Sequence, residues 1–173
     1  VVLGSMDEFV ELVKLARRQG IYTIVCDGYE NGPAKAFADK AYTIDVRDID
    51  GVADMCRAEQ ADGIIASFSD LLAECLVNIA AKAGLKCYCT PEKIRYLREK
   101  PLMKEMFRQL GVPTPTSIRL NADFADEELN AVGLPCVIKP ANGYGSRGIY
   151  VVNSAEEIRS HFSTTASYSS FDY

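Results

Sequence analysis

The chain has 173 residues, of which 48% are hydrophobic and 25% charged, and its formal net charge is -5. This composition is typical of a globular protein and excludes disordered and fibrous classes. The acidic balance provides no basic stripe that could neutralise a nucleic-acid backbone, so nucleic acid is not expected as a partner. No apolar run reaches the roughly 18 to 20 residues that span a bilayer, and a cytoplasmic location is expected.

The first half of the chain alternates strands and helices. Apolar and β-branched stretches predict five strands, at residues 1–3, 21–26, 41–45, 63–68 and 86–89. Helical spacing predicts helices at residues 5–20, 48–60 and 69–83, and a short helical turn within the loop 27–40. Ser5 and Glu8 form a predicted capping box at the first helix. The alternation indicates α/β architecture, a Rossmann-like doubly wound domain with a parallel sheet over residues 1–90.

The second half, residues 91–173, does not continue the regular alternation of strands and helices. Pro91 and Pro101 each stand at the start of a predicted helix, the second of which runs from Lys100 to Gly111. The remaining predicted elements are an extended crossing that leads into a strand at 112–120, a helix at 122–133, two strands at 135–140 and 148–152, and a last helix capped by Ser154 and Glu157. The two strands enclose a glycine-rich loop.

The cysteines and the histidine do not predict a metal site. Six cysteines are scattered through apolar runs, which indicates buried, reduced thiols. Cys87 and Cys89 alternate onto one face of the predicted strand, but neither a second close pair nor a nearby histidine completes a zinc site. His161 is the only histidine in the chain. No metal ligand is therefore assigned.

The glycine loop has the spacing Gly143-x-Gly145-x-x-Gly148. A dinucleotide fingerprint requires a helix immediately after the loop, but residues 149–152 form a strand pattern. A P-loop requires Gly-Lys-Ser/Thr at the position held here by Ser146-Arg147-Gly148. The remaining interpretation is a hairpin loop. Its bare amides could approach phosphate oxygens, or it could be a mobile surface turn.

Two lysines near this loop are candidate anion ligands. Lys139 closes the strand 135–139 without an adjacent acidic residue, so its ammonium could meet an anionic ligand; the alternative is a lysine that reaches solvent from the strand edge. Lys100 stands at a helix boundary and is the second candidate, with a solvated surface lysine as the alternative.

The segments "EKPLMKEMFRQLGVPTP" (99–115) and "LPCVIKPANGYGSRGIYVV" (134–152) resemble the ATP-grasp superfamily of carboxylate-amine and carboxylate-thiol ligases. The first half is similar to the preATP-grasp domain of these enzymes. The resemblance implies a preATP-grasp domain at 1–90 and a truncated, small α+β ATP-grasp subdomain at 91–173. It implies that ATP is bound by Lys100, Lys139 and a loop that closes over the β- and γ-phosphates, Gly143, Tyr144, Gly145, Ser146, Arg147 and Gly148.

The resemblance also implies the chemistry. Such ligases transfer the γ-phosphoryl group of MgATP to a small carboxylate, and an amine or similar nucleophile attacks the acylphosphate. The family's adenine hinge and Mg²⁺ ligands lie downstream of the loop, and no initiating methionine is present. We therefore expect a fragment of a longer ligase that is inactive alone. The alternative is a non-catalytic nucleotide-binding or regulatory module. A homodimer is left open.

Four residues are candidate contacts for the substrate. Gly4, Ser5, Ser69 and Asp70 follow predicted parallel strands, whose carboxyl ends form the usual ligand edge. Helix capping is the alternative for Ser5 and Asp70. The first half is similar to purine-biosynthetic ligases, carbamoyl-phosphate synthase and biotin carboxylase. The purine transformylase branch has an acidic residue after the fourth strand, where this chain has Ser67 and Ser69 before Asp70, so the carbamoyl-phosphate synthase and biotin carboxylase types are favoured.

Overall fold

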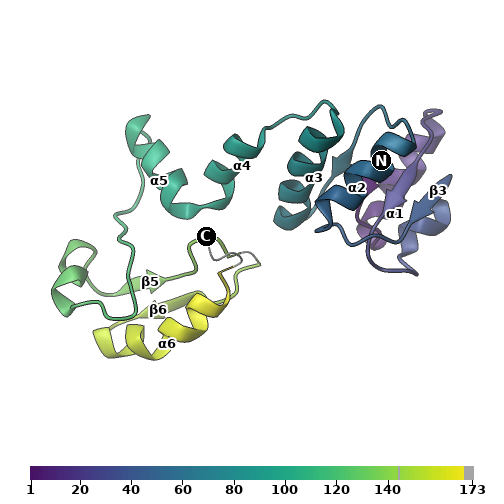
Figure 1. Cartoon of the computed structure of the whole chain (residues 1–173). Coiled ribbons are helices and arrows are strands. Elements are labelled where there is room, and N and C mark those ends of the chain that lie inside the picture. The colour runs from purple at the N-terminus through teal and green to yellow at the C-terminus, as the bar shows by residue number, and fades with distance from the viewer. Residues whose placement is uncertain (144, 170–173) are drawn as a thin grey trace. The chain divides into compact units, whose positions relative to one another are not determined.

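The computed structural model describes residues 1–143 and 145–169. The chain divides into two compact units, Val1–Ile94 and Arg95–Tyr173, and each is described by itself (Figure 1). The domain boundary after residue 90 stays a prediction. Among the helices in the described part of the chain, none combines the length and apolarity needed to cross a membrane.

A parallel sheet forms the centre of the first unit. Its strands have the order β3-β2-β1-β4, and every neighbouring pair is parallel. They are β1 (Val2–Leu3), β2 (Ile24–Cys26), β3 (Lys40–Tyr42) and β4 (Ile65–Ala66). The parallel α/β architecture predicted from the alternating pattern is confirmed.

Helices cover both faces of this sheet. The elements are α1 (Asp7–Arg18), the 3-10 helix η1 (Pro33–Phe37), α2 (Ile49–Ala58) and α3 (Asp70–Ala83). Because side chains alternate along a strand, Val2 packs with Phe9 and Val13 of α1, whereas Leu3 packs on the opposite face with side chains of α2 and α3. The core therefore has two apolar layers. The carboxyl ends of the strands lie together at one edge of the sheet.

Two local predictions in this unit are wrong. Residues 86–89 form no strand, although the alternation is real, since Cys87 and Cys89 pack against the core and Tyr88 is 73% exposed. This short segment forms no hydrogen bonds with a neighbouring strand, and Pro91, which follows it, has no backbone N–H to donate. The capping box is also absent, because Ser5 is drawn into the core, and α1 begins after Met6 without a side-chain cap.

The second unit contains a two-stranded antiparallel hairpin backed by a helix. Helix α4 (Pro91–Arg98) spans the division between the two units. The elements of the second unit are α5 (Lys100–Gln109), the 3-10 helix η2 (Asp126–Ala131), β5 (Cys136–Ile138), β6 (Tyr150–Val152) and α6 (Ala155–Ser167). Val152 and Ile158 of α6 share a small core with Phe124 and Leu129. Figure 1 shows α6 beside β5 and β6.

The predicted elements of this unit are largely present, with two differences. The strand–loop–strand hairpin is confirmed, and the Ser154 hydroxyl accepts the Glu157 N–H at 3.2 Å as the predicted cap of α6. The segment 112–120 contains no strand, and the helix predicted at 122–133 is the short η2. Two prolines in the first segment limit ladder pairing, because proline has no N–H to donate.

Candidate functional site

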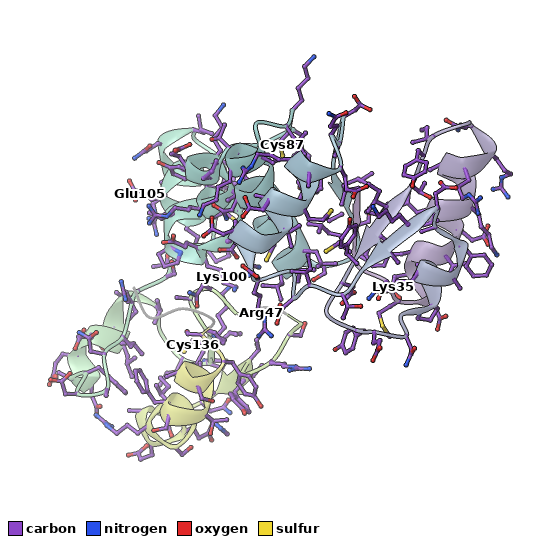
Figure 2. All side chains as sticks on the ribbon, turned by 45° about the vertical axis from the view of Figure 1, so that its right-hand side comes forward. Lys35, Arg47, Cys87, Lys100, Glu105 and Cys136 are labelled. Atoms are coloured by element: carbon purple, nitrogen blue, oxygen red, sulfur yellow. The ribbon has the colours of Figure 1, made fainter. Side chains whose placement is uncertain are left out.

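The start of α5 is attached to the glycine loop. The Lys100 backbone N–H donates to the Ala141 carbonyl at 2.9 Å, and the Lys100 Nζ donates to the Gly143 carbonyl at 2.9 Å. Pro101, in the first turn, favours a helix start at this position. Lys100, labelled in Figure 2, is half-buried. The structure therefore brings together Lys100 and the first residue of the loop, which are 43 positions apart in the sequence.

Lys104 is a cation that the sequence analysis missed. It follows Lys100 by one turn of α5, is 9% exposed, and donates from Nζ to the Pro115 carbonyl at 2.9 Å. Burial lowers the pKa of the Lys104 ammonium, and the positive charges of Lys139 and Arg108 lower it further. The spacing of four residues on one helix face was the signal available in the sequence. Lys139 is thus one of the positive charges that act on the Lys104 ammonium.

Lys139 follows β5 and is exposed. Within the part of the chain that the structure describes, no carboxylate lies within ion-pair distance of its ammonium. Arg147 and Ser146 are also exposed. Among the described residues, the loop end of the hairpin therefore carries two exposed cations, Lys139 and Arg147, that form no ion pair with a carboxylate.

The glycine loop needs its glycines for two different reasons. Gly145 and Gly148 both have a φ of +66°, in the left-handed region that favours glycine. A Cβ at Gly145 would meet nothing within 4 Å, whereas a Cβ at Gly148 would lie 2.6 Å from the Tyr168 ring. Gly148 is buried and Gly145 exposed. Tyr144, assigned with the loop, lies outside the described residues.

One face of the hairpin is apolar and open. Val137 and Val151 are opposite each other in the β5–β6 register and are 53% and 70% exposed, and Ile149 is 43% exposed. The other face carries Ile138 and Tyr150, which pack in the core under α6. Because side chains alternate along a strand, Lys139 continues the face of Val137. The exposed apolar surface of Val137, Val151 and Ile149 thus adjoins Lys139.

The candidate substrate residues lie in the first unit, at the carboxyl ends of β1 and β4. Gly4 has a φ of +105°, and a Cβ there would lie 2.5 Å from the Phe9 ring. Ser5 is fully buried, and its Oγ has no hydrogen-bond partner among the described residues. Ser69 caps α3 by accepting the Leu72 N–H at 3.4 Å, and Asp70 is the first residue of that helix.

The thiols and acidic groups offer no assembled metal site. None of the six cysteines, all of which are among the described residues, forms a disulfide, and Cys26, Cys56 and Cys75 are buried. Among residues 1–143 and 145–169, no group of three or more His, Cys, Asp or Glu side chains is arranged to hold a metal ion.

Comparison with known proteins identifies the family. Residues 99–173 match the family model of the carbamoyl-phosphate synthase L chain, ATP binding domain. The formate-dependent phosphoribosylglycinamide formyltransferase of Methanocaldococcus jannaschii is 33% identical over 165 residues, which are 91% of this chain and 41% of that protein. The corresponding protein of Ignicoccus hospitalis is 30% identical, over 94% of this chain and 40% of its own length. The chain belongs to the ATP-grasp superfamily.

Solved ATP-grasp structures have the same fold as this chain. Phosphoribosylglycinamide synthetase from Anaerococcus prevotii has a TM-score of 0.68 and 26% identity, over 99% of this chain and 43% of its own. The biotin carboxylase domain of the 2-oxoglutarate carboxylase from Hydrogenobacter thermophilus has a TM-score of 0.80 and 22% identity, over 96% of this chain and 40% of its own. That structure was determined with MgADP and bicarbonate. The chain thus spans about two fifths of these relatives' lengths.

Proposed function

We propose that this chain carries part of the ATP site of a ligase that activates a small carboxylate as an acylphosphate. The observation that carries the proposal is the junction of α5 with the glycine loop, where Lys100 contacts Gly143 and a further buried cation, Lys104, lies near Lys139. A polyanion is the ligand that a cluster of three lysines favours, because charge-assisted hydrogen bonds are stronger than neutral ones.

The open hairpin face supports a nucleotide over a simple phosphate. Val137, Val151 and Ile149 present exposed apolar side chains on the face that Lys139 continues. A purine base can pack on this surface while its phosphates extend towards the lysines and the loop amides. In this arrangement the loop residues Gly145, Ser146, Arg147 and Gly148 would contact phosphate oxygens, since glycine lets the backbone approach closely.

The proposed reaction is phosphoryl transfer followed by acyl transfer. A carboxylate oxygen attacks the γ-phosphorus, the bond to the β-phosphate oxygen breaks and ADP leaves; a nucleophile then attacks the acyl carbon and phosphate leaves. Lys100 and Lys139 would neutralise charge that moves towards the β-phosphate oxygen as the bond breaks. Mg²⁺ would accompany ATP, but the described residues assemble no ligand set for it, and no step is assigned to it here.

We assign the second substrate to the sheet edge of the first unit. Ser5 is the strongest candidate there, because a fully buried hydroxyl without a partner is costly unless a ligand satisfies it. Gly4, Ser69 and Asp70 share this edge. Formate is the first carboxylate to test, since the relative from Methanocaldococcus jannaschii is named for formate and phosphoribosylglycinamide. A homodimer and a cytoplasmic location stay predictions.

The test is ADP release by the product of the complete open reading frame, supplied with formate and phosphoribosylglycinamide, with bicarbonate, or with amino acids. Lys139→Ala should lower the turnover at least ten- to a hundredfold, because one charge-assisted contact contributes roughly 1.5 to 3 kcal/mol even before any effect on the transition state. The matched control is Lys93→Ala, an exposed lysine of α4. Full activity in the Lys139 variant would remove that residue from the mechanism. MgATP binding without turnover on any substrate would favour the non-catalytic module.

A further inference from the structure

The last turns of α6 hold the end of the glycine loop. Thr165 is 5% exposed, and its hydroxyl donates to the Gly148 carbonyl at 3.1 Å. The ring of Tyr168 lies so close that a Cβ on Gly148 would be 2.6 Å from it. At the other end of the loop, the Gly143 carbonyl accepts from Lys100. The loop is therefore anchored at both ends through its carbonyl oxygens by donors that lie outside it.

The hydrogen bond from Thr165 to the Gly148 carbonyl determines the direction of the Ile149 N–H. The peptide between Gly148 and Ile149 is trans, and the C=O and N–H of a trans peptide point in opposite directions. Since Thr165 holds the carbonyl towards α6, the Ile149 N–H points away from α6. The helix packs on the hairpin face of Tyr150, opposite to that of Val137.

We propose that Thr165 is a positioning residue for the nucleotide: by holding the Gly148 carbonyl, it directs the Ile149 N–H and the turn at residues 145–148 towards the phosphates. This inference rests on the proposed ATP site. It gives a function to the buried hydroxyl of Thr165. The residue acts through the backbone of the loop, so its removal should alter nucleotide affinity without removing any charged group.

The experiment compares three variants of the complete protein by calorimetric titration with MgADP. Thr165→Val keeps the shape of the side chain but removes the donor, and should raise the Kd for MgADP about tenfold, which corresponds to the loss of about 1.4 kcal/mol. Thr165→Ser keeps the hydroxyl and should bind MgADP as the unchanged protein does. Thr164→Val is the matched control, because the same change is made at the preceding, exposed position of the same helix.

A second readout separates positioning from general stability. In ¹H–¹⁵N spectra without nucleotide, Thr165→Val should shift the Gly148 and Ile149 amide signals, and Thr164→Val should leave them in place. Thr165→Val that folds and binds MgADP with unchanged affinity would overturn the inference. If Thr165→Val does not fold, the comparison is made between Thr165→Ala and Thr165→Ser, whose side chains differ only by the hydroxyl. Equal affinities of these two variants for MgADP would then overturn the inference. Failure of the unchanged protein to bind MgADP would instead overturn the proposed function.

Discussion

A pair of glycine substitutions separates backbone strain from packing in the loop. Gly145 and Gly148 share a φ of +66°, so alanine at either position should cost roughly 1 to 2 kcal/mol in the free energy of unfolding. At Gly145 nothing else is lost, because a Cβ would meet open space. At Gly148 the Cβ would also lie 2.6 Å from the Tyr168 ring and 3.3 Å from the Thr165 Cα. Such overpacking adds about 1 to 3 kcal/mol.

Native-state hydrogen exchange of the α6 amides measures this difference locally. Gly148→Ala should lower the opening free energy of residues 155–167 more than Gly145→Ala does, by about 1 to 3 kcal/mol. Adding Tyr168→Ala should reduce the gap, because it removes the nearest obstructing atoms. Equal effects of the two alanines, or a gap unchanged by Tyr168→Ala, would refute the packing argument.

Three further predictions follow from exposed and buried side chains. Val151→Asp should leave stability unchanged but weaken MgADP binding roughly tenfold by titration, because it places a charge on the open face. The control Val112→Asp changes another exposed valine that is distant in sequence from the hairpin, and should have no effect. Ser5→Ala should leave the free energy of unfolding in urea unchanged or raise it by up to about 1 kcal/mol, since it removes an unsatisfied hydroxyl. The same variant should lower turnover of the second substrate. A clear loss of stability would contradict this prediction. Burial raises the pKa of the Cys26 thiol to about 11, so at about pH 8 the native protein should be alkylated at the half-buried Cys136 and not at Cys26, as peptide mass spectrometry would show.

Particular elements show which signals were local. The start of α3 near residue 69, the cap at Ser154 and the hairpin around the glycine loop could be read from the sequence, because each depends on residues a few positions apart. The cap of α3 is Ser69, whereas the sequence suggested Asp70. The structure at 86–89 and at Ser5 could not be read in this way. In both cases tertiary packing, of the cysteine side chains and of Ser5 respectively, took precedence over a local pattern.

By itself, the sequence determined the parallel α/β architecture, the hairpin and the superfamily motifs, since these rest on periodicity and on short spacings. Only the tertiary structure placed Lys100 against Gly143, buried Lys104 beside the charge of Lys139, left Val137 and Val151 uncovered, and joined Thr165 to Gly148. The physical reason is separation along the chain. A contact between residues 43 positions apart is decided by how helices and strands pack, and no local propensity encodes it.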